Sequence, residues 1–258
     1  MSDKKTVTWQ KIFFELRMIA SNPYINIFGV GFPIFLACMI SKAVEGEIPD
    51  ARLVKEATTQ IFLGLGTIIP MATVLMGYAV SRSVEIEKGI SERMSLFGIA
   101  PMEIVLNRIC AQLIFMAGAF LLFFAVGGLC GYIMAPKLSG VILYVVCMVV
   151  LTIILFSLGH GVASLCRKYG LTYMVSMILY FAIMVLSGMM GMSYDQFPKA
   201  MKAVAKLLPT TYINDSDYVK AWLGNSYNLW PIVQAFLFMT AASGILLFVA
   251  VKRKNSRY

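Results

Sequence analysis

Residues 141–165 read VILYVVCMVVLTIILFSLGHGVASL, a run of 25 residues without Asp, Glu, Lys or Arg. A helix of about 20 apolar residues can cross the hydrocarbon core of a bilayer. Backbone polar groups in lipid find no water partners, so such a run must form a helix or join a closed barrel. The run lacks the two-residue alternation of barrel strands, and a transmembrane helix is therefore predicted.

Five further apolar runs have a similar length. They are Tyr24–Ile40, Ile61–Val80, Ile109–Met134, Leu171–Met192 and Pro231–Val251. The first is the shortest and contains Pro33. Together with residues 141–165, these runs predict an all-α polytopic membrane protein with six transmembrane helices and no linker between domains, so residues 1–258 are expected to form a single transmembrane domain.

Composition supports a membrane protein. Hydrophobic residues make up 59% of the chain and charged residues 14%, whereas a soluble domain carries about 25% charged residues. The net charge is +9, but the basic residues lie in short segments between the runs and are not interleaved with aromatics. We therefore expect attraction to an anionic membrane surface and no nucleic-acid partner. The five cysteines are interpreted as small buried residues rather than a disulfide framework.

The basic residues also predict an orientation. If the N-terminus is inside, fourteen of the 22 Lys and Arg residues fall in the inner segments 1–23, 81–108, 166–170 and 252–258. Because the segments on the two sides have similar total lengths, this bias favours both termini in the cytoplasm.

Residues 1–23 are predicted to contain an interfacial helix. Trp9, Ile12, Phe13, Leu16 and Ile19 recur at helical spacing, with Lys11, Glu15 and Arg17 between them. An extension of the first span is the alternative, and Pro23 favours a break between the two.

The inner segment 81–108 reads SRSVEIEKGISERMSLFGIAPMEIVLNR. We expect a short helix over Gly89–Phe97 that points into the cytoplasm, and a third span that begins near Pro101, where proline suits the first helical position. The outer segment 193–230 carries Phe197, Met201, Val204, Leu207 and Leu208 at helical spacing, followed by Pro209. Short helices at the outer end of the bundle are predicted there, and Tyr218, Trp222 and Trp230 are expected to lie at the membrane interface.

The sequence gives no support for several kinds of functional site. Gly-Lys never occurs, so no glycine-rich phosphate loop is present. His160 is the only histidine; it is interpreted either as a neutral residue hydrogen-bonded between helices or as part of a polar pathway. The central parts of the spans carry no charged residue, which argues against a secondary transporter. Small residues recur four apart and predict close helix packing: Gly127 with Gly131, Ser157 with Gly161, and Ser187 with Gly191.

Two segments, in this order among six spans, resemble the permease subunits of type-two ATP-binding-cassette exporters, which include drug-resistance, bacteriocin-immunity and sodium-export permeases. The first comprises Glu87-Lys88-Gly89 with Glu92, Gly98, Pro101 and Glu103. The second comprises Phe197-Pro198 through Leu208-Pro209, then Tyr212, Asp215 and Trp222-Leu223-Gly224. Gly89 departs from the pattern, since many relatives carry an acidic residue at that point.

The resemblance implies a bacterial cell-membrane exporter built from two permease subunits, the same or homologous, and two ATPase subunits. ATP and magnesium would bind the ATPase, and this chain would bind no cofactor or metal and perform no catalysis. The short helix in segment 81–108 would be the coupling helix that docks on the ATPase. Its expected coupling residues are Glu87, Lys88, Gly89, Glu92, Arg93, Met94, Leu96 and Phe97.

The expected cargo is a hydrophobic or amphipathic compound, such as a drug, an antimicrobial peptide or a lipid-like molecule, moved out of the cytoplasm or the inner leaflet. Candidate residues along its path are Phe28, Phe32, Met71, Met76, His160, Met184 and Met189. The alternatives are a secondary transporter or pore that needs no motor and, with less support, a membrane-embedded enzyme.

Overall fold

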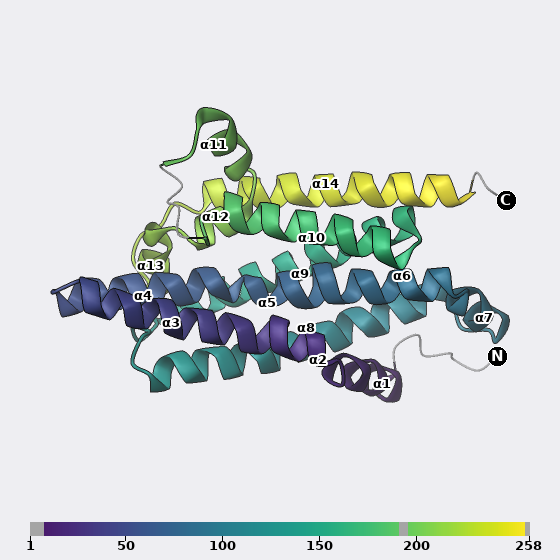
Figure 1. The fold of residues 1–258 in the computed structure, drawn as a ribbon, viewed down its shortest axis with the longest axis horizontal. Helices are drawn as coiled ribbons and strands as arrows, with labels where there is room; N and C mark the ends of the chain where they lie inside the picture. Colours follow the sequence, from purple (N-terminus) through teal and green to yellow (C-terminus); the bar gives the residue numbers. More distant parts are fainter. Residues whose placement is uncertain (1–7, 191–195, 256–258) are drawn as a thin grey trace.

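The computed structural model describes residues 8–190 and 196–255, and all regular elements within them are helical (Figure 1). Within these ranges, six helices are long and apolar enough to cross a membrane, which confirms the predicted class. The last four are α8 (Pro101–Leu129), α9 (Leu138–Cys166), α10 (Tyr169–Leu186) and α14 (Trp230–Asn255). They run along the long axis of the bundle beside the first two spans.

The second span is longer than predicted. The expected limits were Ile61–Val80, but the helix continues from Ala51 to Glu87 through α4 (Ala51–Gly66), α5 (Ile68–Pro70), η2 (Met71–Tyr78) and α6 (Ala79–Glu87). In the apolar window of this span 83% of residues are buried, more than in any other span. The polar stretch that follows Val80 is therefore not a loop but a helical extension of the most enclosed element.

The first span is Pro23–Glu47, formed by α2 (Pro23–Asn26), the π-helical η1 (Ile27–Gly31) and α3 (Phe32–Glu47). Asn22 caps its start, because the amide of Tyr24 donates to the Asn22 side chain at 3.1 Å. Both this span and the second contain a π-helical stretch near a proline, a residue that lacks the amide needed for regular helix bonding.

Other span limits also differ from the predicted ones. α8 begins at Pro101, as expected, but ends at Leu129 and not at Met134, because Gly131 adopts a φ of 74°. α10 ends at Leu186, five residues before the gap in the described chain, and Met192 lies outside the described residues. α9 and α14 extend a few residues beyond their predicted limits.

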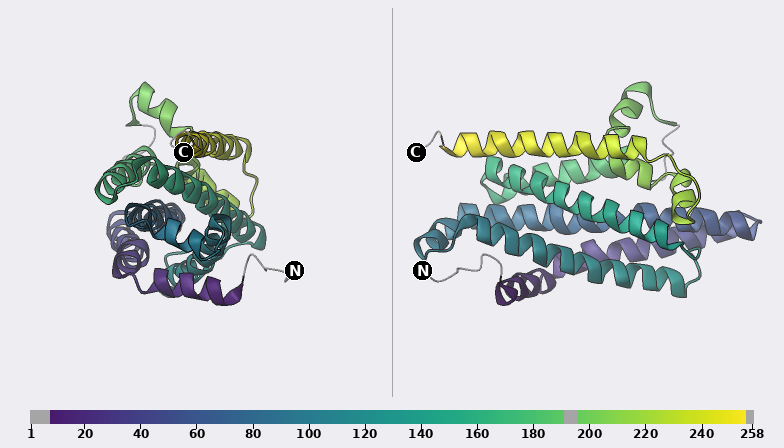
Figure 2. Two further views of the ribbon diagram at one scale, coloured as in Figure 1. Left: turned by 90° about the vertical axis from the view of Figure 1, so that its right-hand side faces the viewer. Right: turned by 180° about the vertical axis from the view of Figure 1, so that it is seen from behind.

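Helix α1 (Trp9–Ala20) lies across the bundle axis, as the view from the end of the bundle shows (Figure 2, left). It packs against α8 and exposes Phe13, Phe14 and Met18. The predicted separate helix before Pro23 is confirmed for residues 9–20. Glu15 differs from expectation, because it is buried against α8 rather than exposed on a polar face.

Three short helices form the opposite end of the bundle, which we call the α13 end. They are α11 (Lys199–Ala205), α12 (Pro209–Ile213) and α13 (Ser216–Trp222), and they confirm the predicted short helices (Figure 1). The interfacial placement of Tyr218 and Trp222 is wrong. Both are buried, because Trp222 stacks on Phe124 and its indole donates to the carbonyl of Met134 at 3.0 Å. Trp230 is exposed, as an interfacial residue would be.

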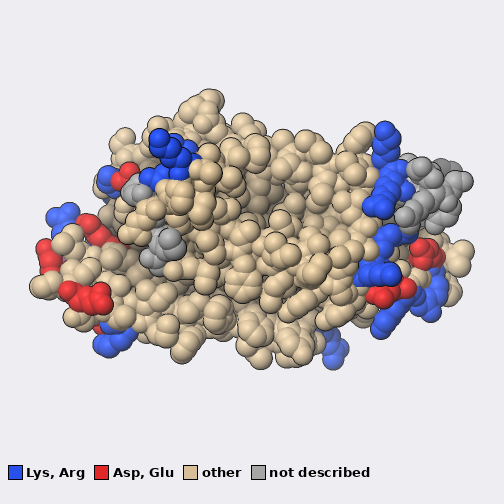
Figure 3. All heavy atoms as spheres, turned by 45° about the horizontal axis from the view of Figure 1, so that its top comes forward, with Lys and Arg blue, Asp and Glu red and all other residues tan. Residues whose placement is uncertain are grey.

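On the face drawn in Figure 3, charged side chains gather at the two ends of the molecule, with a largely uncharged band between them. α1, α7 (Ile90–Leu96) and the last turn of α14 share one end, which we call the α7 end (Figure 1). The first and the last described helices, α1 and α14, therefore reach the same end of the bundle. Which side of the membrane this is stays a prediction. The cysteines are free, but only Cys147 is buried, and Cys130 is exposed.

Candidate functional site

Helix α7 extends beyond the bundle between two sharp turns. Gly89 before it and Gly98 after it have φ angles of 64° and 78°, a region that glycine enters without steric cost. The amides of Gly98 and Ile99 donate to the carbonyls of Ser95 and Met94, which closes the helix with a Schellman motif. The turns isolate a seven-residue helix at the α7 end, where the coupling helix was predicted.

The exposed face of α7 is apolar at its C-terminal end. Leu96 and Phe97 are each 85% exposed, whereas Met94 is half-buried. Glu92 and Arg93, also exposed, lie beside them. Two large apolar side chains beside charged residues form the pattern of a protein-binding surface, with anchors inside a polar rim.

Two of the predicted coupling residues make bonds within the chain. The Glu87 carboxylate accepts from the amide of Tyr169, the first residue of α10, at 2.7 Å. A carboxylate at a helix N-terminus satisfies an unpaired amide and interacts favourably with the helix dipole. Arg93 donates to the carbonyl of Lys88 at 2.9 Å. These bonds fix the turn between α6 and α7 and join it to α10.

An arginine on α6 holds α7 in place. Arg82 donates from Nη1 to the hydroxyl of Ser91 on α7 at 2.5 Å and to the carboxylate of Glu85 at 3.0 Å. The side chains of Arg82 and Glu85 are 15% and 13% exposed. Because both are mostly shielded from water, their interaction is screened less than one at the surface.

Arg108 on α8 links three helices. Its guanidinium makes a two-bond pair with Glu85 of α6, and its Nε donates to Glu15 of α1 at 3.0 Å. Lys11 of α1 also pairs with Glu103 of α8. Burial raises the pKa of the Glu15 carboxyl above its ordinary value, against the opposing effect of Arg108. The cluster Arg82, Glu85, Arg108 and Glu15 forms a buried charge network that connects α7, α6, α8 and α1.

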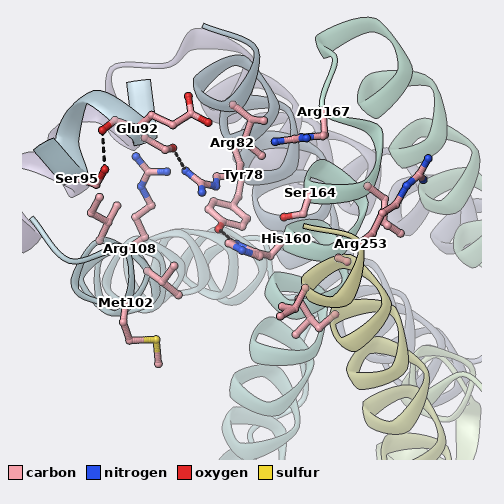
Figure 4. Close-up of a pocket in the computed structure, with 18 residues that line it drawn as sticks. Tyr78, Arg82, Glu92, Ser95, Met102, Arg108, His160, Ser164, Arg167 and Arg253 are labelled. Atoms are coloured by element: carbon pink, nitrogen blue, oxygen red, sulfur yellow. Dashed lines mark hydrogen bonds between the residues drawn. The ribbon is translucent and has the colours of Figure 1, made fainter. Parts of the chain in front are cut away.

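A cavity of about 460 Å³ lies beside this network (Figure 4). Its walls come from η2, α6, α7, α8, α9 and α14, and its polar lining includes Arg82, Arg108, Arg167, Arg253 and Glu92. Met102, Val105 and Leu247 contribute apolar surface. Within the described residues, no group of three His, Cys, Asp or Glu side chains could hold a metal ion.

His160 lines this cavity and is hydrogen-bonded between helices. Its Nδ1 lies 2.6 Å from the hydroxyl of Tyr78 on η2 (Figure 4). Its glycine neighbours allow close packing, since a Cβ at Gly161 would lie 2.8 Å from Leu246 of α14. The predicted hydrogen bond between helices is therefore present, whereas the neutral state of His160 and its part in a polar pathway stay predictions.

The structure does not bring the candidate path residues into one cavity. Of the seven, only His160 is among the residues that line the cavity at the α7 end. Met71, Met184 and Met189 are buried in the core, Met76 and Phe32 are half-buried, and Phe28 is 55% exposed on the outer side of the first span. The substrate path stays a prediction.

The buried charge network was not predicted. The sequence placed Glu15 on the exposed face of an interfacial helix and counted Arg82 and Arg108 only as inner basic residues. One signal was present: Arg108 directly precedes the apolar run that begins at Ile109, and Glu85 follows soon after the run that ends at Val80, and a charged residue near the end of a span needs a partner.

Comparison with known proteins places these features in context. A family model described as ABC-2 type transporter matches residues 6–216, which include α1, α7, the charge network and α8 to α12. No curated protein matches the chain.

Proposed function

Since that match covers well over half of its length, the chain belongs to the ABC-2 type transporter family, and we propose that it is the permease subunit of an ATP-driven exporter. A family of this kind implies a partner ABC ATPase. In our proposal the ATPase supplies the energy, a second permease subunit (the same or homologous) completes the pathway, and a hydrophobic or amphipathic compound leaves the cytoplasm or the inner leaflet.

The exposed surface of α7 carries the proposal. Leu96 and Phe97 are almost fully exposed at the end of a short helix whose backbone is fixed by two left-handed glycines. Large apolar side chains held on a rigid element lose little entropy when a partner buries them. We infer that they are the anchors for the ATPase, with Glu92 and Arg93 at the rim of the contact.

A movement of α7 has a direct route into the membrane part of the chain. α7 follows α6, which is the last part of the most enclosed span. Arg108 joins α6 to α8 and α1, and Glu87 joins the turn to α10. Force applied at α7 would thus reach four helices through hydrogen bonds and packed side chains, a physical network of the kind that can carry coupling between sites.

The central parts of the described spans favour an apolar cargo. Each of the six spans contains an 18-residue window with at most two Asp, Glu, Lys or Arg residues. Pumps driven by proton or sodium gradients usually need buried ionisable groups in such places. The outward direction of transport rests on the resemblance described above. A drug, an antimicrobial peptide and a lipid-like molecule are equally compatible with spans of this apolar composition.

The test is affinity purification of the tagged chain from its native membrane in mild detergent, with mass spectrometry of what it retains. The double variant Leu96→Ala/Phe97→Ala removes the proposed anchors. Interface anchors contribute about 2 kcal/mol or more each, so two should weaken binding about 1000-fold. We expect an ABC ATPase with the native chain and none with this variant.

The matched control also replaces two exposed apolar side chains by alanine, but at the opposite end of the bundle. Leu129 and Leu138, at the α13 end, are 89% and 76% exposed, and Leu129→Ala/Leu138→Ala should retain the ATPase. Equal recovery with all three proteins would refute docking through α7. If the native chain retains no ATPase even after crosslinking, the ATP-driven mechanism itself is wrong.

A further inference from the structure

The cavity at the α7 end has an excess of positive charge that the proposed coupling role does not use. Four arginines line it, and the one acidic residue in its described lining is Glu92, which is exposed. Its volume of about 460 Å³ falls within the range of about 300–1000 Å³ found for small-molecule sites. The cavity therefore has the size and the charge of a binding site for an anion.

The four arginines are not equivalent. Arg82 and Arg108 are paired with Glu85 and Glu15 in the buried charge network. Arg167 and Arg253 make no ion pair with any residue in the described ranges 8–190 and 196–255. A guanidinium presents a planar set of donors that matches the oxygens of phosphate or carboxylate. Two such groups remain available to a ligand.

Arg167 has an uncommon backbone conformation. Its φ is 57°, and it is the only residue other than glycine with a positive φ among those described. It ends α9 at a position where glycine is usual, and a bulky residue there is strained. In Figure 4 the Arg167 side chain points toward Arg82 and Tyr78, whereas the Arg253 side chain, on α14, is exposed and points away from them. The chain keeps a guanidinium at the cavity in spite of this strain.

Part of the cavity wall, on α8 and α14, is apolar and reaches the outer surface of the bundle. Met102 of α8 and Val251 of α14 line it and are 64% and 57% exposed. Val105 and Leu247 lie deeper. Arg167 directly follows the fourth span and Arg253 is the last residue of the sixth, so the site lies at the ends of the spans, which is where the headgroup of a membrane amphiphile is expected.

We propose that this cavity binds the phosphate headgroup of an anionic amphiphile. Arg167 contacts the phosphate oxygens, Arg253 adds positive charge at the exposed rim of the cavity, and the apolar side chains of α8 and α14 contact the first carbons of the attached chain. This goes beyond the proposed export function, because the bound molecule acts as a ligand of this chain whether or not it is also cargo.

Calorimetric titration of the purified chain in neutral detergent tests the proposal. The probes are dihexanoyl phosphatidic acid, dihexanoyl phosphatidylcholine and inorganic phosphate. We expect the first to bind at least tenfold more tightly than the other two. Arg167→Gly/Arg253→Gln should weaken its binding at least tenfold, and Arg167→Gly alone should weaken it while keeping the fold, since glycine favours a positive φ.

The control Arg52→Gln/Lys220→Gln removes the same net charge from the α13 end and should bind as the native chain does. Three results would overturn the proposal: undiminished binding by the cavity variants, equal binding of phosphatidylcholine, or equal binding of inorganic phosphate. The last would show a soluble phosphate ligand, to which the apolar walls contribute nothing. The titration needs no ATPase. A negative titration would therefore not contradict the proposed exporter function, and a failure to recover an ATPase would not contradict headgroup binding.

Discussion

Replacement of Arg108 by methionine should be the most damaging single change in the charge network. Arg108 and Glu15 are each 7% exposed, and the side chain of Glu85 is 13% exposed. Methionine keeps much of the length but removes both ion pairs. Removal of one partner from a buried pair costs about 3–5 kcal/mol, because the remaining charge is left in a medium of low polarity. For a chain of this size that is a fall in Tm of about 6–20 °C.

The loss of stability caused by Arg108→Met should depend on pH. Burial already raises the pKa of the Glu15 carboxyl, and Arg108 opposes that shift. Without Arg108 the pKa rises further, and the folded protein binds this proton more tightly than the unfolded chain. A raised carboxyl pKa gives stability that is present below the ordinary value of 4.5 and is lost as pH rises through the folded value. The variant should therefore lose less stability at pH 5 than at pH 8.

Thermal unfolding in detergent, followed by tryptophan fluorescence, measures this loss. Trp222 is 4% exposed and reports the core, whereas Trp9 and Trp230 are already 65% exposed. Arg52→Met is the control, because its side chain is 81% exposed and an exposed pair contributes about 0–1 kcal/mol. A normal Tm for Arg108→Met, or the same loss at both pH values, would refute the reasoning.

Two further substitutions test the α7 turn and the packing of α9. Gly98→Ala places a Cβ at a φ of 78°, which costs about 1–2 kcal/mol. We expect Tm to fall by only about 2–8 °C, less than for Arg108→Met, but less ATPase to be recovered in the affinity purification; full recovery would contradict a role for the turn in docking. Gly161→Ala brings a Cβ within 2.8 Å of Leu246 and should destabilise the protein by about 1–3 kcal/mol in the same thermal assay. Gly118→Ala, which has open space around it, should not.

The sequence predicts which segments cross the membrane but not where their helices end. An apolar run shows which residues face lipid or the protein core. A helix can continue past such a run into polar residues, because its backbone hydrogen bonds do not depend on apolar side chains. Ser81–Glu87 is polar and was expected to leave the bundle, yet it remains helical and packs against α9 and α10. Gly98 and Pro101 did predict the end of α7 and the start of α8, because their effects on the backbone are local.

The contacts of the site depend on packing between distant segments. Glu15 and Arg108 are 93 residues apart in sequence, and nothing in their local patterns indicates that α1 rests on α8. Trp222 shows the same limit, since an aromatic residue near a span end suits both the membrane interface and the core. The exposure of Leu96 and Phe97, by contrast, follows from a short helix between two turns and could be predicted.

The second span continues in one direction although its helical bonding changes at Thr67 and through η2, and its length has a mechanical consequence. At about 1.5 Å per residue its 37 residues extend about 55 Å, and Figure 1 shows α4, α5 and α6 in one line. A rod of that length which tilts by about 5° about its middle moves each end by about 2.4 Å. Such a shift at the α7 end exceeds what the 2.8 Å bond from Arg108 to Glu85 can accommodate. Either that bond breaks or α8 moves together with the second span. The ion pair between Arg108 and Glu85 therefore determines whether α6 and α8 move together or separately.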